Sequence, residues 1–259
     1  MIYITGDTHG DFSRFSTKRF PQQKDMTSND FVIICGDFGG VWDQEETPAE
    51  KHNLDWLNSK NFTLLFCDGN HENFDRLKKY PIVRFHGGNA HRIRNNIYHL
   101  MRGYVYDFDG TKIFVFGGAK SHDIKDGILN PADYSDRRSL MAVYRWHQLC
   151  GHYVRINHLS WWKEELPSSQ ERKRGLRSLE RADYHVDYIV SHCLPFSIEQ
   201  LMYKDCKADS ITKYFDQILE HGIRFKRWYC GHYHRNQDLN SKMRILYERI
   251  IPLESGDVT

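Results

Sequence analysis

The stretch Phe62-Thr-Leu-Leu-Phe-Cys67, followed directly by Asp68-Gly69-Asn70-His71-Glu72, joins an apolar run to a cluster of polar side chains. The run is short, rich in branched and aromatic residues and ended by turn formers, as expected of a strand buried on both faces. Two earlier runs end in the same way, Ile2–Thr5 at Gly6-Asp7-Thr8-His9-Gly10 and Phe31–Cys35 at Gly36-Asp37-Phe38-Gly39-Gly40. This repetition predicts a sheet whose strands carry polar loops at their carboxyl ends.

The last third of the chain returns to the same pattern. Val186–Val190 leads into Ser191-His192, and Lys226–Cys230 leads into Gly231-His232-Tyr233-His234. Helix-like stretches lie between the predicted strands. Thr47-Pro48 resembles an N-cap followed by a first-turn proline, which predicts a helix to about Ser59. A shorter helix is expected at 73–80, and a charged helix from Trp161 to about Asp183. Alternating strands and helices predict an α/β fold, with a sheet covered by helices.

The middle of the chain has a different character. Residues 97–100, 103–107 and 112–116 are predicted strands, and Asp109-Gly110 supplies a hairpin turn between the last two. Residues 124–160 follow no clear period and are crowded with Arg, His, Tyr and Trp. We expect them to form either a lid or inserted subdomain, or an ordinary segment that runs over the surface. No internal repeat or linker is evident, so a single domain spanning 1–259 is the simplest prediction.

Composition limits the classes of function. Lys and Arg number 36 against 34 Asp and Glu, so nothing steers the whole chain towards nucleic acid or anionic membranes. The basic run Arg172-Lys173-Arg174 is interleaved with acidic residues and is interpreted as a solvated helix face. No apolar run approaches the roughly 18 residues of a membrane span. The N-terminus opens into a predicted strand with no room for a signal sequence, so a cytoplasmic protein is expected.

The cysteines indicate no disulfide framework. There are six, and none forms a CxxC pair. Cys35, Cys67 and Cys230 end apolar runs, where buried free thiols are expected. A disulfide scaffold is improbable in a chain of 259 residues, and a reducing compartment fits better.

The polar clusters together predict a metal site. Ligands of open α/β sheets collect at the carboxyl ends of strands. The side chains expected at one edge are therefore Asp7, His9, Asp37, Asn70, His192, His232 and His234. Residues two apart in an extended segment point to the same side, so each of the pairs Asp7/His9 and His232/His234 is expected to address one metal region. Carboxylate, imidazole and amide donors suit Mn, Fe or Zn, and donor softness does not choose among them.

In these five blocks the sequence resembles the calcineurin-like metallophosphoesterase superfamily. The matching motifs, which occur in the family's order, are Asp7-Thr8-His9, Gly36-Asp37, Gly69-Asn70-His71-Glu72, His192 and Gly231-His232-Tyr233-His234. The resemblance extends from residue 1 to about 250. It implies a four-layer sandwich of two stacked mixed β-sheets flanked by helices.

The resemblance also implies a role for each matching residue. Asp7, His9 and His234 would hold a first transition-metal ion, Asn70, His192 and His232 a second, and Asp37 would bridge them. Two such ions about 3.5–4 Å apart clamp a phosphate and supply hydroxide at neutral pH. The implied activity is hydrolysis of phosphomonoesters or phosphodiesters, as a phosphatase or phosphodiesterase. Asn70 and His71 are the expected catalytic residues, and His71 is the general acid that protonates the leaving oxygen.

Three positions depart from the family pattern. Many relatives carry an Asp that orients the catalytic His where this chain has Gly40, which leaves Asp43 and Asp68 as candidate substitutes. The protein Ser/Thr phosphatase branch carries phosphate-clamping arginines where this chain has Val41 and Asp68, so that branch is disfavoured. Arg92, Arg102 or an Arg of residues 124–160 are candidate replacements. Histidines outside the motifs are expected to be structural or surface residues, with His122 the least secure of them: His86, His91, His122, His147, His152 and His158.

Several alternatives stay open at this point. The expected substrate is a small phosphate ester or nucleotide, with nucleic acid and membrane partners disfavoured. A metal-dependent nuclease is the first alternative, although Glu72 stands where nuclease relatives generally carry Asp. A non-catalytic scaffold of the same fold is the second, although all seven ligand positions are intact. The sequence does not determine the metal pair, the choice between monoester and diester, or the oligomeric state.

Overall fold

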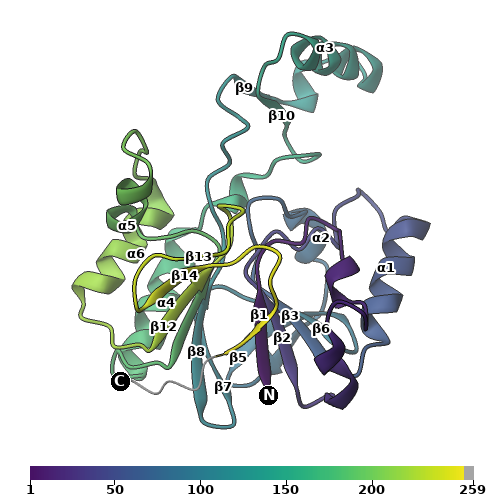
Figure 1. Ribbon diagram of the computed structural model, residues 1–259. Coiled ribbons are helices and arrows are strands. Elements are labelled where there is room, and N and C mark those ends of the chain that lie inside the picture. Colours follow the sequence, from purple (N-terminus) through teal and green to yellow (C-terminus); the bar gives the residue numbers. More distant parts are fainter. Residues whose placement is uncertain (254–259) are drawn as a thin grey trace.

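The computed structural model describes residues 1–253 and contains two mixed β-sheets that face each other between helices (Figure 1). The seven-stranded sheet runs in the order β15 (Ile251–Pro252), β1 (Ile2–Thr5), β2 (Phe31–Ile34), β3 (Thr63–Phe66), β6 (Ile97–Leu100), β5 (Gly88–Arg94) and β4 (Ile82–Phe85). The six-stranded sheet runs in the order β13 (Gln237–Asp238), β14 (Met243–Ile245), β12 (Arg227–Cys230), β11 (Tyr188–Ser191), β8 (Thr111–Phe116) and β7 (Tyr104–Phe108). The end of the predicted domain at residue 259 lies outside the described residues.

The central strands of both sheets are parallel. In the first sheet β1, β2, β3 and β6 pair in parallel, and in the second β14, β12, β11 and β8 do so. The outer strands β15, β5, β4, β13 and β7 pair antiparallel. Because the parallel strands run the same way, their carboxyl ends collect at one end of each sheet, at the top of Figure 1.

The core explains why the strand sequences are apolar throughout. Ile33 and Leu65 face the other sheet and pack in one cluster with Val115, Val190 and Tyr229. Their neighbours on the strands point the other way, and each sheet buries its outer face against helices. Both faces of each central strand are therefore buried. The predicted four-layer sandwich is confirmed, as are the buried thiols of Cys35, Cys67 and Cys230.

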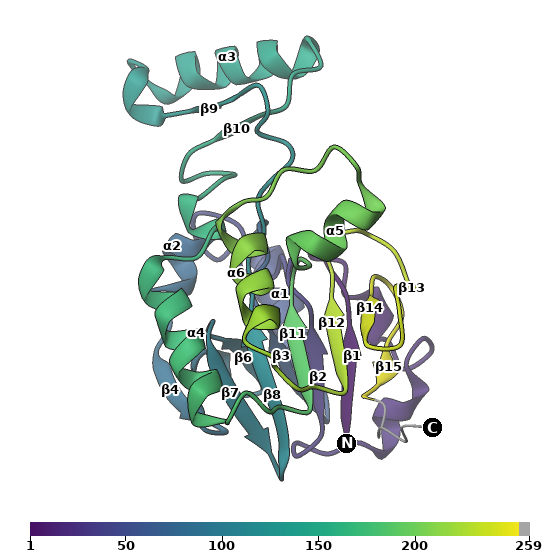
Figure 2. The same ribbon diagram turned by 90° about the vertical axis from the view of Figure 1, so that its left-hand side faces the viewer.

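Helices cover the outer faces of the sheets (Figure 2). The helices of the sandwich are α1 (Pro48–Asn58), α2 (Phe74–Leu77), α4 (Ser169–Arg181), α5 (Phe196–Met202) and α6 (Ser210–Glu220). Short 3₁₀ turns are η1 (Ser13–Phe15), η2 (Pro21–Asp25), η3 (Pro131–Asp133) and η4 (Lys163–Glu165). The predicted start of α1 is confirmed, because the Thr47 side chain accepts a hydrogen bond from Glu50 N and proline opens the helix.

The predicted charged helix begins later than expected. Its first residue is Ser169 rather than Trp161, and residues 163–165 form only a 3₁₀ turn. Pro167 disfavours helical backbone at the residue before it. Ser168 then caps the helix in a capping box with Glu171. The proline and the Ser168 cap therefore set the start of the helix, and the pattern of charged residues alone does not indicate it.

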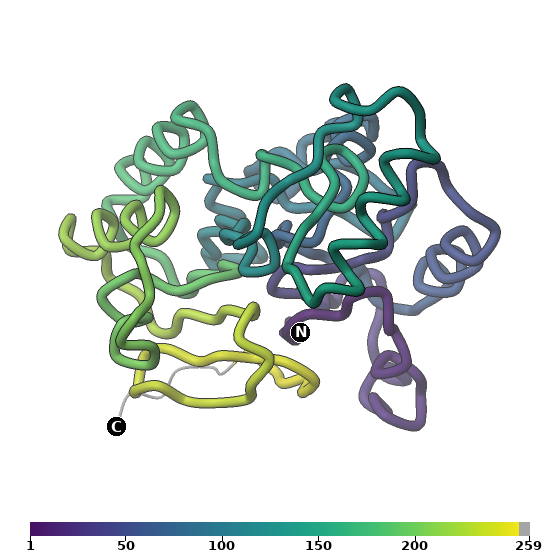
Figure 3. Tube along the Cα trace, turned by 90° about the horizontal axis from the view of Figure 1, so that it is seen from above, coloured from purple at the N-terminus to yellow at the C-terminus, as the bar shows by residue number. Residues whose placement is uncertain are grey.

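Residues 124–160 form an ordered projection, which we call the arm. It contains β9 (Gly127–Leu129), α3 (Arg137–Leu149) and β10 (Val154–Ile156), with β9 and β10 paired in parallel. The arm extends beyond the sandwich on the side where the parallel strands end (Figures 1 and 2), and seen from above its teal trace lies over the sandwich (Figure 3). Whether it acts as a lid stays a prediction. Within residues 1–253, no helix has the length and apolar character required to cross a bilayer.

Candidate metal centre

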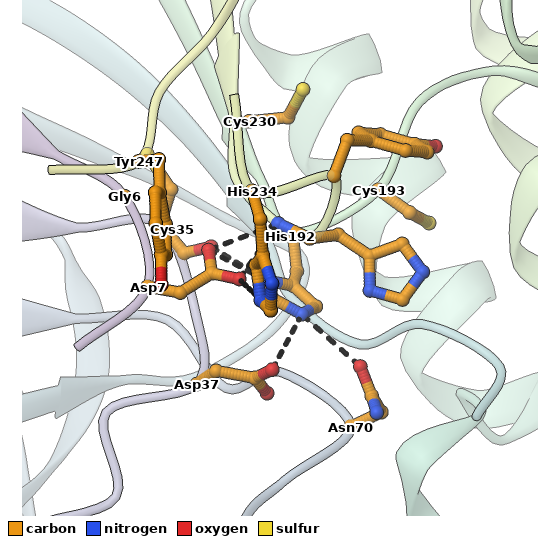
Figure 4. Close-up of polar contacts among 12 residues, drawn as sticks. Gly6, Asp7, Cys35, Asp37, Asn70, His192, Cys193, Cys230, His234 and Tyr247 are labelled. Atoms are coloured by element: carbon orange, nitrogen blue, oxygen red, sulfur yellow. Dashed lines mark hydrogen bonds and ion pairs between the residues drawn. The ribbon is translucent and has the colours of Figure 1, made fainter. Parts of the chain in front are cut away.

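The predicted ligand loops follow parallel strands of both sheets. Those after β1, β2 and β3 come from one sheet, and those after β11 and β12 come from the other. Because the sheets are stacked with these strand ends on the same side, loops far apart in sequence meet there (Figures 1 and 4). The site is therefore assembled across the interface between the sheets.

A first group of donors consists of Asp7, His9 and His234. The Nε2 atoms of the two histidines lie 3.0 Å apart. Asp7 Oδ2 lies 3.2 Å from His234 Nε2 and 3.8 Å from His9 Nε2. All three donor atoms lie within 4.8 Å of one another, so a single cation can reach them together. Asp7 is buried and both histidines are exposed, so this group opens to solvent.

A second group consists of Asp7, Asp37 and His192, all buried. Asp37 Oδ2 lies 3.3 Å from His192 Nε2 and 3.6 Å from His9 Nε2. Asn70 Oδ1 lies 3.2 Å from the same His192 nitrogen (Figure 4). Asp7 is the carboxylate shared by the two groups, whereas the resemblance implied a bridging role for Asp37. Asp37 nevertheless faces histidines of both groups, so the two carboxylates lie side by side at the centre of the site.

His232 does not join His234, which corrects the expectation that the pair would address one metal region. The backbone is left-handed at His9, His232 and His234, with φ values of 45°, 67° and 50°. The extended-strand argument therefore does not apply to these loops. The His232 ring lies beside His192, with ring centroids 4.9 Å apart, and its Nε2 lies 3.1 Å from Nε2 of His122. Backbone strain of this kind concentrates at functional sites.

Asn70 is oriented by a chain of buried side chains. Its Nδ2 donates to Ser121 Oγ at 3.2 Å, so its Oδ1 faces His192. Ser121 N in turn donates to Glu165 Oε1 at 3.1 Å, and Ser121 Oγ donates to the other oxygen of Glu165. Burial raises the pKa of Glu165 to about 7. This chain presents the amide oxygen, a metal-binding atom, to the site.

The electrostatics of the site suit a cation. Although burial opposes charge on both groups, His192 lowers the pKa of Asp37. Asp37 and Asp7 outweigh the effect of burial on His192 and raise its pKa to about 10. Two buried carboxylates therefore attract positive charge, which a metal ion supplies more effectively than a proton. The donor set and its charge fit a transition-metal site.

The glycines of three motifs allow the ligand loops to pack closely against one another. A Cβ at Gly36 would lie 2.2 Å from His192 Nδ1, one at Gly69 would lie 1.9 Å from Asp37 Oδ1, and one at Gly231 would lie 2.0 Å from Asp7 Oδ1. Each glycine precedes one predicted ligand and lies against another from a different loop. The loops pack this closely only because these positions lack side chains.

We therefore expect Gly69→Ala to weaken metal binding. The added methyl group displaces either Asp37 or the loop that carries Asn70, so the affinity for at least one metal ion should fall tenfold or more, at the low end of the roughly 10–100-fold effects of misoriented ligands. Isothermal titration of the metal-free protein measures this change. Gly110→Ala is the control for strain away from the site: its Cβ meets open space, but φ is 92°, so this variant strains a hairpin turn and should leave metal affinity unchanged. Equal affinities in the wild type and Gly69→Ala would contradict the prediction.

His71 follows Asn70 and is anchored through its backbone. His71 N donates to Asp37 Oδ1 at 2.8 Å, and the side chain is partly exposed at the mouth of the site. Its Nε2 lies 3.9 Å from Asp123 Oδ2. Neither candidate substitute for the missing orienting Asp has this position. Asp43 accepts a hydrogen bond from Thr47, and Asp68 is engaged elsewhere.

Asp68 belongs to a buried network behind the site. Its Oδ2 accepts from Arg102 Nε at 2.7 Å and also from Nη2, and its Oδ1 lies 3.1 Å from His99 Nε2. Burial raises the pKa of Asp68, but Arg102 and His99 outweigh it and bring the pKa to about 2. Arg102 is 3% exposed and committed to this carboxylate, so it is not the replacement phosphate clamp that the sequence suggested.

The sequence interpretation missed a sixth loop. Ser121, His122 and Asp123 follow β8 and approach Asn70, His232 and His71 respectively. Arg155 of β10 completes the group by pairing with Asp123. A signal was present, because β8 is an apolar run ended by Gly117-Gly118, and glycine also follows closely after β1, β2, β3 and β12. The intervening Lys120 and the absence of a family motif hid it.

A pocket of about 450 Å³ opens beside the two groups. Its wall contains His9, His71 and Arg155 together with Trp42 and Asn53. A volume of this size holds a small organic molecule. The mixture of imidazole, guanidinium, indole and amide groups offers both charge and an aromatic face to such a molecule.

Comparisons with known proteins agree with this geometry. Residues 1–236 match the family model described as calcineurin-like phosphoesterase. Lariat debranching enzyme A of Xenopus laevis is 26% identical over 148 residues, which is 52% of this chain and 26% of that protein. The match thus spans about a quarter of that relative's length. A candidate 5′-nucleotidase from Staphylococcus aureus, solved with alpha-ketoglutarate, aligns with a TM-score of 0.40 and 14% identity over 95% of this chain and 48% of that chain. Because the family model covers most of the chain, the protein belongs to the calcineurin-like phosphoesterase family.

Proposed function

We propose that the protein is a phosphoesterase that uses two transition-metal ions. The observation that carries this proposal is the pair of donor groups that share Asp7, one with His9 and His234 and the other with Asp37 and His192. Two adjacent groups of mixed oxygen and nitrogen donors are the arrangement that a dinuclear site requires.

The seven predicted ligands divide between the two ions. Asp7, His9 and His234 would hold the first ion, and Asn70, His192 and His232 the second, with Asp37 between them. The oxygen and imidazole donors suit Mn, Fe or Zn. When bound, such ions polarise the phosphoryl oxygens and supply a nucleophile at neutral pH.

The protein's own groups complete the chemistry. His71 lies beside Asp37 and on the wall of the pocket, where it can donate a proton to the departing oxygen of the ester. This places the leaving group in the pocket with Trp42, Asn53 and Arg155. Ser121 and Glu165 keep the amide of Asn70 fixed while this happens. No covalent bond to the protein is required.

A small phosphate ester or nucleotide is the proposed substrate. The pocket beside His71 has a volume of about 450 Å³, which suits a leaving group of the size of a nucleoside. The indole of Trp42 offers a face on which a flat ring can stack. We further propose that residues 1–253 form one domain with the arm as a projection of it.

The decisive experiment combines metal analysis with a substrate panel. Purified protein is stripped with chelator, reconstituted with Mn²⁺, Fe²⁺ or Zn²⁺, and assayed on aryl monoesters and diesters, nucleotides, cyclic nucleotides, DNA and RNA. We expect two metal equivalents per chain, loss of turnover on stripping and its recovery on reconstitution. Preferential cleavage of DNA or RNA would establish a nuclease instead. Failure to bind metal, with no turnover of any substrate, would favour a non-catalytic scaffold.

A further inference from the structure

Gly40 leaves His71 without the carboxylate that orients this residue in many relatives, and the structure shows why no side chain stands there. A Cβ at Gly40 would lie 2.4 Å from the ring of Phe38, which is buried in the core. An Asp at this position would require the core to repack. A proton donor nevertheless needs a fixed ring and tautomer, so the orienting group must come from another part of the chain.

Asp123 is the carboxylate that lies against His71. It stands where the chain leaves β8 for the arm, and its Oδ2 is 3.9 Å from His71 Nε2. Its other oxygen, Oδ1, is buried and has no hydrogen-bond partner among the described residues. A buried, unsatisfied carboxylate oxygen is costly and requires an explanation. A role as acceptor for the His71 N–H provides one: the ring nitrogen now lies nearest to Oδ2, and a small shift of the ring brings it within hydrogen-bond distance of the carboxylate, as catalytic hydrogen bonds often tighten only when substrate binds.

Arg155 holds Asp123 in this position. Its Nε donates to Asp123 Oδ2 at 2.8 Å, and its Nη2 donates to the same oxygen. Arg155 lies on β10, by which the chain returns from the arm, so this ion pair joins the two ends of the arm at its base. The same guanidinium lines the pocket with His71 and His9. The pair therefore connects the arm to the wall of the catalytic pocket.

We propose that Asp123, held by Arg155, is the positioning residue for His71 and replaces the carboxylate absent at Gly40. This inference rests on the proposed function, in which His71 donates a proton to the leaving oxygen. Asp123 accepts the hydrogen of one ring nitrogen and so directs the other nitrogen to the leaving group. Arg155 fixes the carboxylate by two hydrogen bonds to Oδ2, the oxygen nearest to His71, while Oδ1 keeps its full capacity to accept a hydrogen bond. The arm thus contributes to catalysis from its base.

The test uses the chemistry of the leaving group. A general acid matters little when the leaving group departs readily as an anion, and much when it needs a proton. We compare Asp123→Asn with wild type on a series of aryl phosphates that runs from p-nitrophenyl to unsubstituted phenyl and p-methoxyphenyl. The expected loss in kcat is about 10–100-fold for the poorest leaving group, part of the range for general acid catalysis. For p-nitrophenyl phosphate we expect a loss below about 3-fold, which also shows that the variant is folded.

A double-mutant cycle tests the role of Arg155. If Arg155→Gln acts only through Asp123, the double variant Asp123→Asn/Arg155→Gln should be no slower than Asp123→Asn alone. Asp133→Asn, an exposed carboxylate of the same arm, is the matched control and should behave as wild type. Metal content, measured by elemental analysis, should be unchanged in all variants. Asp123→Glu should recover part of the lost rate on the poor leaving groups.

Two outcomes overturn the inference. An equal loss on all esters would mean that Asp123 is only structural, and wild-type rates on every ester would mean that it does not act on His71. Failure of the proposed function looks different, because wild type itself would then show no metal-dependent turnover of any ester.

Discussion

Asp37→Asn should reduce kcat by at least about 10³-fold and remove at least one metal ion from the purified protein. Asp37 is 1% exposed and lies between the two donor groups, with its Oδ2 3.3 Å from His192 and 3.6 Å from His9. The amide keeps the shape but loses the charge, and it presents either one neutral oxygen or an N–H₂ group to the cations. This effect exceeds the roughly 10–100-fold cost of losing a group that only orients a ligand.

Elemental analysis and steady-state kinetics measure the two parts of this prediction. Asp37 also accepts the backbone N–H of His71, a bond that Asn can retain through its oxygen. The loop should therefore stay in place, and circular dichroism should show a folded protein. Asp133→Asn is the control, because this exposed carboxylate of the arm belongs to neither donor group and does not line the pocket. Two bound metal ions and normal turnover in Asp37→Asn would exclude the proposed centre.

His71→Ala should reduce kcat by about 10²–10⁴-fold for esters with poor leaving groups, the range typical of a lost general acid. Alanine retains the backbone N–H that donates a hydrogen bond to Asp37, so metal binding should be unaffected. The loss should shrink towards p-nitrophenyl esters, whose anion leaves without a proton. This split between leaving groups distinguishes a proton donor from a residue that binds the phosphate, which would affect all esters alike.

The matched control is His52→Ala, which removes an exposed histidine of α1. Wild-type kinetics in this variant would show that losing an imidazole has no general effect. If His71→Ala retained normal turnover of phenyl phosphate, another group would have to protonate the leaving oxygen. Asp123→Asn should show the same leaving-group dependence as His71→Ala but a smaller loss, since it disturbs the ring without removing it.

Strand and loop positions were accessible from the sequence because they depend on short segments. Apolar runs that end in polar or turn-forming residues locate β1, β2, β3, β11 and β12 within a residue or two. The boundary of α4 was not accessible in the same way, because it was predicted at Trp161 and lies at Ser169. The charge pattern extends further than the helix itself, and Pro167 with the Ser168 cap decides where the helix begins.

The donor set of the candidate site was likewise predicted from strand-end position and the resemblance. The side chains of six of its seven members are linked by contacts of 4 Å or less in the structure, and the seventh, His232, donates its backbone N–H to Asp7. The pairing of His232 with His234 was wrong because the backbone of this loop is left-handed, a feature that hydrophobic period does not encode. Glycine precedes Asp37, Asn70 and His232, but the reason for it is visible only from the neighbouring loop that packs against each of these glycines.

The sequence by itself determined the strands, the loops that follow them and the kinds of side chain those loops carry. Only the tertiary structure decided which loops meet, because the contacts join residues more than 100 positions apart, such as Asn70 with His192. It also decided what surrounds them: Ser121 behind Asn70, His122 against His232, and Asp123 with Arg155 beside His71. The physical reason is that periodicity reports only the face a residue occupies. The partners of a site residue depend on how the two sheets stack and on where β10 of the arm brings Arg155 back to the site.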